Sequence, residues 1–148
     1  MQFFERRRII IKTMEEEEVE EYYNQLQLDQ RERATKVKET KKCVRKCINA
    51  NPNDSMLFFA VRERGSDRLI GTILTKNIGT GKISVQISIP RESNEWSYGV
   101  EIVDQFKKIC KEEKFFRNIK ILKLDTSSKS IRKYMEGKNI TSSYISVA

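Results

Sequence analysis

Residues 83–89 (ISVQISI) alternate aliphatic and polar side chains, and Pro90 follows them. A period of two is typical of a strand with one buried face, and proline ends such a strand. Residues 56–62 (MLFFAVR) form an almost continuous apolar run, which predicts a strand buried on both faces. Residues 68–76 lie between these two runs as a returning strand, with a glycine-containing turn on either side. The middle of the chain therefore predicts consecutive antiparallel hairpins.

Two helices are predicted before these hairpins. The first follows Thr13, a predicted N-cap, and Glu16 three residues later completes a capping box. Its apolar face consists of the residues at positions i, i+3, i+4 and i+7, which are Val19, Tyr22, Tyr23 and Leu26. A second helix is predicted from about Arg33 to Ala50, and a polar stretch with a proline ends it.

The second half of the chain predicts two more helices. One starts near Ser97 and buries five residues at helical spacing, which are Ile102, Val103, Phe106, Ile109 and Cys110. The other is short, is capped by Ser127 or Ser128, and ends at Gly137. The remaining predicted strands are residues 7–12, 119–124 and 144–147.

The resulting order of elements is β-α-α-β-β-β-α-β-α-β, and the chain shows no internal repeat and no linker. Antiparallel hairpins followed by a strand–helix–strand crossover predict a mixed sheet with helices packed on it. We therefore expect an α+β fold, with a mixed antiparallel and parallel sheet, in a single domain spanning residues 1–148.

Composition narrows the chemistry. The 148 residues include no histidine and only three cysteines. A Ser-His-Asp triad, a Cys-His pair, a histidine zinc site and a four-cysteine metal site are therefore excluded within one chain, and we expect no metal. Any proton transfer must use carboxylates, Tyr, Lys, Cys or water. With no apolar run of membrane-spanning length and no signal-peptide pattern, we expect a cytoplasmic protein with reduced thiols that does not interact with membranes.

The net charge of +8 is unevenly distributed. Residues 14–30 carry seven acidic and no basic side chains, whereas residues 31–46 carry eight basic and two acidic ones. Residues 107–138 carry eleven basic and four acidic side chains. The first two segments read as solvated helix faces that attract each other. The third reads either as an ordinary lysine-rich solvated surface or as a surface that attracts phosphates. Nucleic acid is a conceivable partner of the basic segments but is not favoured, because no RNA-recognition or helix-turn-helix pattern is present.

Residues 94–99 (NEWSYG) connect the alternating strand at 83–89 to an amphipathic helix. Glycines at such a connection let the backbone approach a pyrophosphate, and the N–H groups of the helix start point at it. This segment, the hairpin at 68–73 (RLIGTI) and residues 124–134 (LDTSSKSIRKY) resemble the GNAT superfamily of acyl-CoA-dependent N-acetyltransferases, most closely the ribosomal-protein N-terminal type. In this sequence Gly99 matches the second glycine of the family motif, while Ser97 replaces the first glycine and Asn94 the Gln or Arg.

The resemblance implies acetyl-CoA as the cosubstrate and assigns a role to particular positions. Its cofactor-binding residues would be Ile87, Ser88, Ile89, Asn94, Glu95, Trp96, Ser97, Tyr98, Gly99, Ser127 and Ser128. Tyr134 would be the catalytic acid that protonates the leaving thiolate. Lys129, Arg132 and Lys133 would attract the phosphates of the coenzyme.

The implied reaction is direct attack of a primary amine on a thioester carbonyl that a backbone N–H at the end of the fourth strand polarises. The amine would be a protein N-terminus, a lysine or a small molecule. No base is evident, because Gln86 cannot titrate; Glu15–Glu18 or water could serve the amine. The alternatives are a non-catalytic binding module with weak or lost CoA binding and a basic nucleic-acid-associated protein. In each case we expect a monomer or a homodimer.

Overall fold

The computed structural model describes residues 8–47, 56–90, 98–113, 116, 118–126, 128–138 and 144–147. Within these ranges the elements follow the predicted order. The strands are β1 (Ile9–Thr13), β2 (Leu57–Glu63), β3 (Leu69–Gly79), β4 (Lys82–Ser88), β5 (Ile121–Thr126) and β6 (Tyr144–Ser146). The helices are α2 (Glu16–Asn24), α3 (Gln30–Cys47), α4 (Gly99–Glu112) and α5 (Lys129–Gly137). No described helix has the length and hydropathy needed to cross a bilayer.

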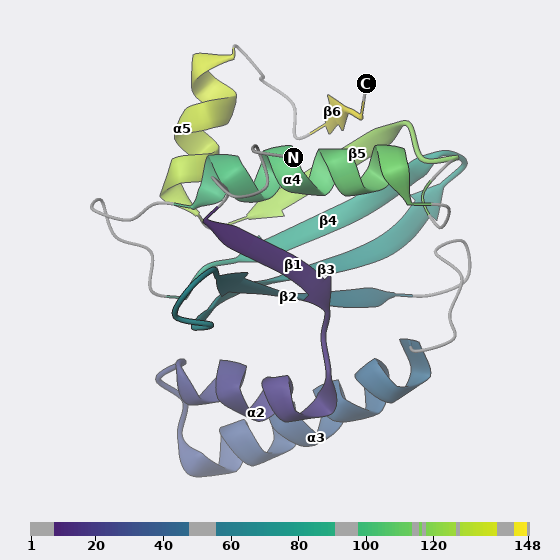
Figure 1. Ribbon diagram of the computed structural model, residues 1–148. Coiled ribbons are helices and arrows are strands. Elements are labelled where there is room, and N and C mark those ends of the chain that lie inside the picture. The colour runs from purple at the N-terminus through teal and green to yellow at the C-terminus, as the bar shows by residue number, and fades with distance from the viewer. Residues whose placement is uncertain are drawn as a thin grey trace.

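The six strands form one mixed sheet in the order β1-β2-β3-β4-β5-β6. Neighbouring strands are antiparallel except β4 and β5, which are parallel and are joined by the crossover that contains α4. Figure 1 shows α2 and α3 on one face of the sheet and α4 and α5 on the other. The predicted α+β class and mixed sheet are confirmed.

The α4/α5 face of the sheet carries the larger core. Alternate residues of β2, β4 and β5 point to this face and pack against α4, including Phe59, Val85 and Leu124. The Phe59 ring meets the Phe106 ring edge-on at 5.6 Å. Burial raises the pKa of the Cys110 thiol to about 12, so this cysteine is a packing residue rather than a nucleophile.

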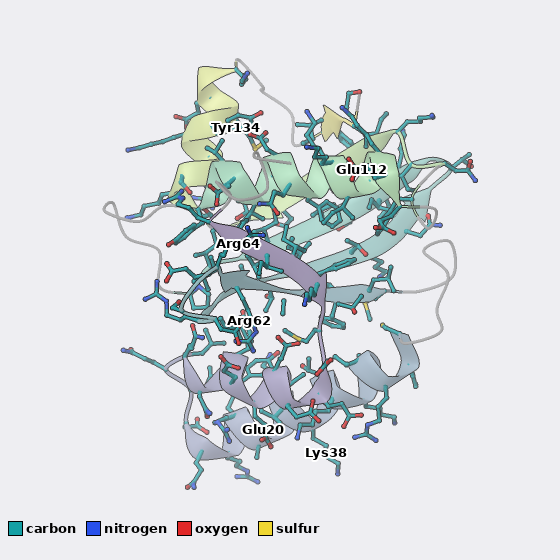
Figure 2. All side chains as sticks on the ribbon, in the orientation of Figure 1. Glu20, Lys38, Arg62, Arg64, Glu112 and Tyr134 are labelled. Atoms are coloured by element: carbon teal, nitrogen blue, oxygen red, sulfur yellow. The ribbon has the colours of Figure 1, made fainter. Side chains whose placement is uncertain are left out.

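The α2/α3 face carries a smaller core surrounded by ion pairs. Six buried residues form this core: Met14, Val19, Val37, Val44, Ala60 and Leu69. Glu16 and Glu20 of α2 form ion pairs with Arg45 and Lys41 of α3, at 2.7 Å and 2.9 Å. Figure 2 shows Glu20 at this helix pair and Arg62 between the sheet and α2. The opposite charges of the two segments therefore form ion pairs between the two helices, as the sequence predicted.

Element boundaries differ from the prediction where local hydrogen bonds decide them. Thr13 is not the N-cap, because it belongs to β1 and pairs with Phe59; Glu15 is the N-cap and Glu18 completes the capping box. The α3 helix begins at Gln30 rather than Arg33, because the Asp29 carboxylate accepts the N–H of Glu32. Ser128 caps α5 by accepting the N–H of Ile131, and the helix ends at Gly137, as predicted.

Candidate active site

Parallel strands β4 and β5 stop pairing at one residue pair, Ile87 and Thr126. There the Thr126 hydroxyl donates to the Ile87 carbonyl at 3.0 Å and accepts the N–H of Ser128 at 2.9 Å. This hydroxyl joins the ends of β4 and β5 to the start of α5. Beyond it β4 continues only beside β3, where Ser88 pairs with Thr72. The two strands therefore no longer pair beyond Ile87, and we call this place the opening between β4 and β5.

The backbone of Ile89 faces this opening. Because N–H and C=O groups alternate sides along a strand, and the Ile87 carbonyl points to β5, the Ile89 N–H points to the same side. No described residue accepts a hydrogen bond from it. Pro90 follows and carries no N–H. The N–H of Ile89 is thus a donor in the place where the sequence predicted that an acyl carbonyl would be polarised.

Helix α4 starts at the same end of the sheet, packed closely on α5. A Cβ added at Gly99 would lie 2.7 Å from Cγ1 of Ile131 and 3.1 Å from its backbone nitrogen. The described contacts thus give Gly99 a packing reason of its own: no larger residue fits between the two helices. The predicted role of this residue toward a pyrophosphate concerns its backbone and is compatible with this contact.

Tyr98 and Glu101 anchor the start of α4 to the edge of the sheet. The Tyr98 side chain is buried, its hydroxyl donates to Glu63 at the end of β2, and the Arg8 guanidinium lies 4.4 Å from the ring centroid. Arg8 also pairs with Glu101 at 3.1 Å. Burial, followed by the bond to Glu63, raises the pKa of Tyr98, whereas the bond from Tyr98 lowers the pKa of Glu63. Tyr98 therefore positions the helix through its side chain and remains neutral.

Of the other predicted site residues, Ser128 and Tyr134 are described by the structure and five are not. Ser128 is buried, and its hydroxyl is occupied as the cap of α5 and by contact with Ser130 at 3.0 Å. Tyr134 lies on α5 with its ring partly buried against the main core and the Lys138 ammonium 5.6 Å from its centroid (Figure 2). Asn94, Glu95, Trp96, Ser97 and Ser127 lie outside the described residues.

A cavity of about 200 Å³ lies on the α2/α3 face beneath β3 and β4, and we term it the β4 cavity. Its lining comprises Met14, Val19, Tyr22, Tyr23, Thr40, Phe58, Thr72, Leu74, Gln86 and Ser88. The Tyr22 hydroxyl bonds the Ser88 hydroxyl at 2.8 Å, and Tyr23 bonds Thr40 at 3.0 Å. Ser88 thus links the cavity to the strand end that holds the Ile89 N–H. From the sequence, Tyr22 was expected only on the apolar face of its helix. Its contact with Ser88 depends on strand register and helix packing, which cannot be read from the sequence.

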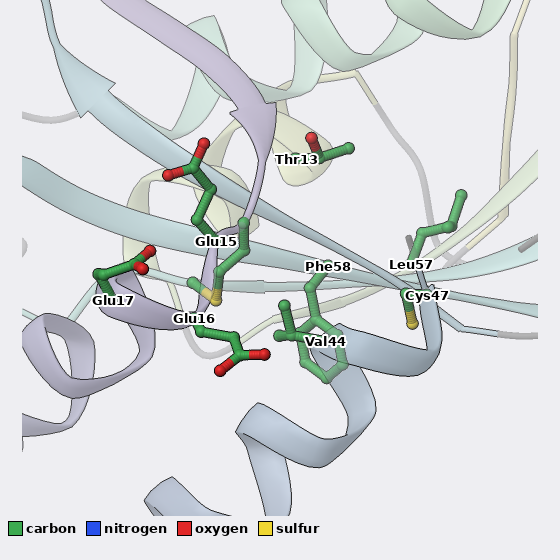
Figure 3. A pocket seen from close by; sticks show the side chains of 9 residues that line it. Thr13, Glu15, Glu16, Glu17, Val44, Cys47, Leu57 and Phe58 are labelled. Atoms are coloured by element: carbon green, nitrogen blue, oxygen red, sulfur yellow. The ribbon is translucent and has the colours of Figure 1, made fainter. Parts of the chain in front are cut away.

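The carboxylates of α2 lie away from this cavity. Arg62 pairs with Glu18 at 3.0 Å and with Glu21 at 2.7 Å, and hydrogen bonding to Glu21 is the main cause that raises the pKa of Arg62. Glu15, Glu16 and Glu17 line a different hollow, of about 610 Å³, together with Val44, Leu57 and Phe58. Figure 3 shows these side chains. None of these carboxylates lines the β4 cavity, so the expectation that Glu15–Glu18 serve the amine is not supported there.

Comparison with known proteins shows which solved structures share the fold of this chain. No family model and no curated protein matches the sequence. The spermidine N-acetyltransferase of Vibrio cholerae in complex with CoA and spermine matches with a TM-score of 0.61 and 11% identity, over 90% of this chain and 80% of that chain. A chimera of this enzyme, SpeG, with hSSAT matches with a TM-score of 0.62 and 14% identity, over 90% and 79%. The chain has a GNAT-like fold.

A dodecameric structure of the same Vibrio cholerae enzyme in an intermediate state also matches, with a TM-score of 0.60 and 12% identity over 90% of this chain and 78% of that chain. At these identities the likeness concerns the GNAT-like fold, including the parallel pair β4 and β5 at which the candidate site lies.

Proposed function

We propose that the protein is an N-acyltransferase that moves an acetyl group from acetyl-CoA to a primary amine. The observation that carries the proposal is the end of pairing between β4 and β5 at Ile87, beyond which the Ile89 N–H points to the side of β5, near the starts of α4 and α5. The GNAT-like fold, shared with spermidine N-acetyltransferases, supports it. A cytoplasmic location and a monomeric or homodimeric state remain part of the proposal.

The described residues around the opening fit a coenzyme A thioester. The Ile89 N–H would hold the acyl carbonyl, and the first-turn N–H groups of the 14-residue helix α4 would hold the pyrophosphate. Arg8 offsets the negative charge of Glu101 in that first turn. Lys129, Arg132 and Lys133, on the first turns of α5, would attract the phosphates. The thioester supplies the acetyl group.

The remaining chemistry needs few residues. A neutral amine nitrogen attacks the acyl carbon while the carbon–sulfur bond breaks, and the Ile89 N–H stabilises the negative charge that develops on the carbonyl oxygen. The amine loses one proton to water before the attack, and the attacking nitrogen gives a second proton to water as the amide forms. Tyr134 donates the proton that the leaving sulfur takes up and is then reprotonated from water. Positioning of the two reactants at the end of β4 supplies the rest of the rate enhancement.

A small amine is the acceptor that the observations support best. The similar structures are spermidine N-acetyltransferases, one of them with bound spermine, and the β4 cavity is enclosed on one side by Tyr22 and Ser88. The ribosomal-protein N-terminal type expected from the sequence, and a lysine acceptor, are alternatives that the same assay distinguishes.

Calorimetry with acetyl-CoA, together with a thiol-release assay over a panel of amines and N-terminal peptides, tests the proposal. Micromolar binding and turnover of at least one amine are expected. Tyr134→Phe should lower kcat about 100-fold with the acetyl-CoA Kd unchanged, whereas Tyr144→Phe, at an exposed tyrosine of β6, should leave both constants unchanged. No binding at millimolar acetyl-CoA would contradict the proposal; binding without turnover of any acceptor would favour the non-catalytic module.

A further inference from the structure

Strand pairing places the carboxylate of Asp125 beside a residue that lines the β4 cavity. In the parallel ladder Asp125 is the partner of Gln86, which lines the cavity and is exposed at its mouth. Leu122 and Leu124 of β5 are buried in the core on the α4/α5 face, so Asp125 points to the opposite face, as Gln86 does. Adjacent strands are about 4.8 Å apart, which places these two side chains next to each other.

Asp125 also lies close to the predicted reaction centre. It directly precedes Thr126, whose hydroxyl marks the point where β4 and β5 part. The Asp125 side chain is exposed, and no ion pair with it occurs in the described part of the chain. Lys123, the nearest cation on the same strand face, pairs in register with Ser84 and is one step farther from the mouth. A carboxylate at this place is available to an ammonium group that enters the cavity mouth.

The interior of the cavity has a different chemistry. Its ten described lining residues present hydroxyls, one amide and apolar groups, and none of the ten carries a formal charge. Two of the hydroxyl pairs, Tyr22 with Ser88 and Tyr23 with Thr40, already bond each other. Four of the five acidic side chains of α2 are paired with Arg62, Lys41 or Arg45, and the fifth, Glu17, does not line this cavity. A second ammonium in this interior would lose its water without gaining a carboxylate.

The volume sets the size of what can enter. A cavity of about 150 Å³ lined by apolar residues holds a benzene molecule, so about 200 Å³ accommodates a short alkyl chain or one ring. An extended polyamine exceeds this space and carries several cations.

From these observations, and resting on the proposed function, we infer that the acceptor is a compact amine with a single cation: Asp125 binds its ammonium group, and the β4 cavity holds its uncharged body. This substrate class differs from that named for the similar structures, which bind or act on polyamines. Asp125 acts by binding and orienting the amine at the end of β4, and water takes the ammonium proton before attack.

The test compares matched acceptors with saturating acetyl-CoA. Pentylamine and cadaverine differ by one terminal ammonium group, and kcat/KM should favour pentylamine at least tenfold. Spermidine should be poorer still. Thr40→Asp, on α3, adds a carboxylate to the lining of the cavity away from Asp125 and should move the preference toward cadaverine by tenfold or more. A wild-type preference for cadaverine or spermidine would overturn the inference.

Variants at Asp125 test the binding residue itself. Asp125→Asn should raise the KM for pentylamine at least thirtyfold, with a smaller change in kcat and an unchanged KM for acetyl-CoA, and Asp125→Glu should restore part of the loss. Asp104→Asn removes the same charge from the exposed face of α4 and is the matched control. Equal kinetics of Asp125→Asn and Asp104→Asn would overturn the role of Asp125.

Direct binding separates this inference from the proposed function. If no amine is acetylated, the proposed function fails, and pentylamine is then titrated alone and followed by NMR of the cavity residues. Shifts confined to residues such as Tyr22 and Thr72, lost in Asp125→Asn but retained in Asp104→Asn, would support the cavity as an amine site. Absence of such shifts at 50-fold excess over protein would overturn the inference independently of catalysis.

Discussion

The two faces of the sheet use the same strands but differ in what covers them. On the α4/α5 face, alternate residues of the strands meet a continuous apolar core that includes Ile87, Ile102 and Ile131. On the α2/α3 face the apolar core is smaller, and several strand positions carry a hydroxyl, an amide or a charged group, as with Ser88, Gln86 and Arg62. One face therefore supplies most of the hydrophobic stabilisation, and the other supplies cavities and polar groups.

This difference separates two tasks within the candidate site. The starts of α4 and α5, where the cosubstrate would be held, are fixed by close packing on the apolar face, and Gly99 marks the closest approach. The acceptor side needs side chains that can exchange hydrogen bonds with a ligand. It retains a cavity, and this space is therefore not filled by apolar core side chains. Variants on the two faces should therefore differ in what they damage.

The largest expected effect is at the centre of the apolar face. Phe106→Ala removes a fully buried ring that packs against Phe59 and Phe116, and should lower the free energy of unfolding by about 3–5 kcal/mol. Phe58→Ala, at a half-buried ring on the opposite face, should cost less than about 2 kcal/mol. Urea denaturation monitored by circular dichroism measures both values, and equal losses would refute the asymmetry between the faces.

A smaller effect is expected where α4 meets α5. Gly99→Ala forces its new methyl group against Ile131 and should destabilise the protein by about 1–3 kcal/mol. It should also weaken acetyl-CoA binding, because the start of α4 must shift. Gly137→Ala is the matched control, since a methyl group there has no neighbour within 4 Å. If both variants melt at the temperature of the wild type, the proposed close packing at Gly99 is wrong.

Ion pairs on the α2/α3 face should contribute less to the free energy of unfolding than the packing at Gly99. Arg62→Met loses bonds to Glu18, Glu21 and the Asp67 carbonyl and should cost about 1–2 kcal/mol, because its side chain is only 20% exposed. Arg45→Met loses a pair whose arginine is 60% exposed, and should cost less than about 0.5 kcal/mol. Thermal melts at 50 mM and 500 mM NaCl check this, and an equal loss in the two variants would contradict the role of burial.

The sequence was sufficient to predict the order of elements, because periodicity and caps are local. The period-two pattern of residues 83–89 and the helical spacing of Ile102, Val103 and Phe106 each identified their element and its buried face. Thr13 was misassigned because an N-cap and a strand end look alike until the partner strand is known; its pairing with Phe59 decided the matter.

The candidate site was only partly predictable, because it depends on register. The end of β4 at Ile87 to Ile89 was anticipated, but the bond from Thr126 that ends the pairing with β5 was not. Similarly, Gln86 and Asp125 are 39 residues apart in sequence, and only the parallel ladder makes them neighbours. A rule that matched polar positions of β4 to those of the next strand would have found this pair.

The smallest expected effect is the pH dependence of the contact between Tyr98 and Glu63, which anchors α4 to the sheet. The bond lowers the pKa of Glu63 below its ordinary 4.5, and burial followed by the bond raises the pKa of Tyr98 above its ordinary 10.0. The Glu63 contribution is therefore present above pH 4.5 and is lost as the pH falls through its folded value. The Tyr98 contribution is present below pH 10.0 and is lost as the pH rises. Tyr98→Phe should thus lower Tm by at most a few degrees between these limits, and the melting curves of the two proteins should converge at both extremes. If the two proteins melt at the same temperature at every pH from 3 to 11, the tyrosine stabilises α4 by packing alone.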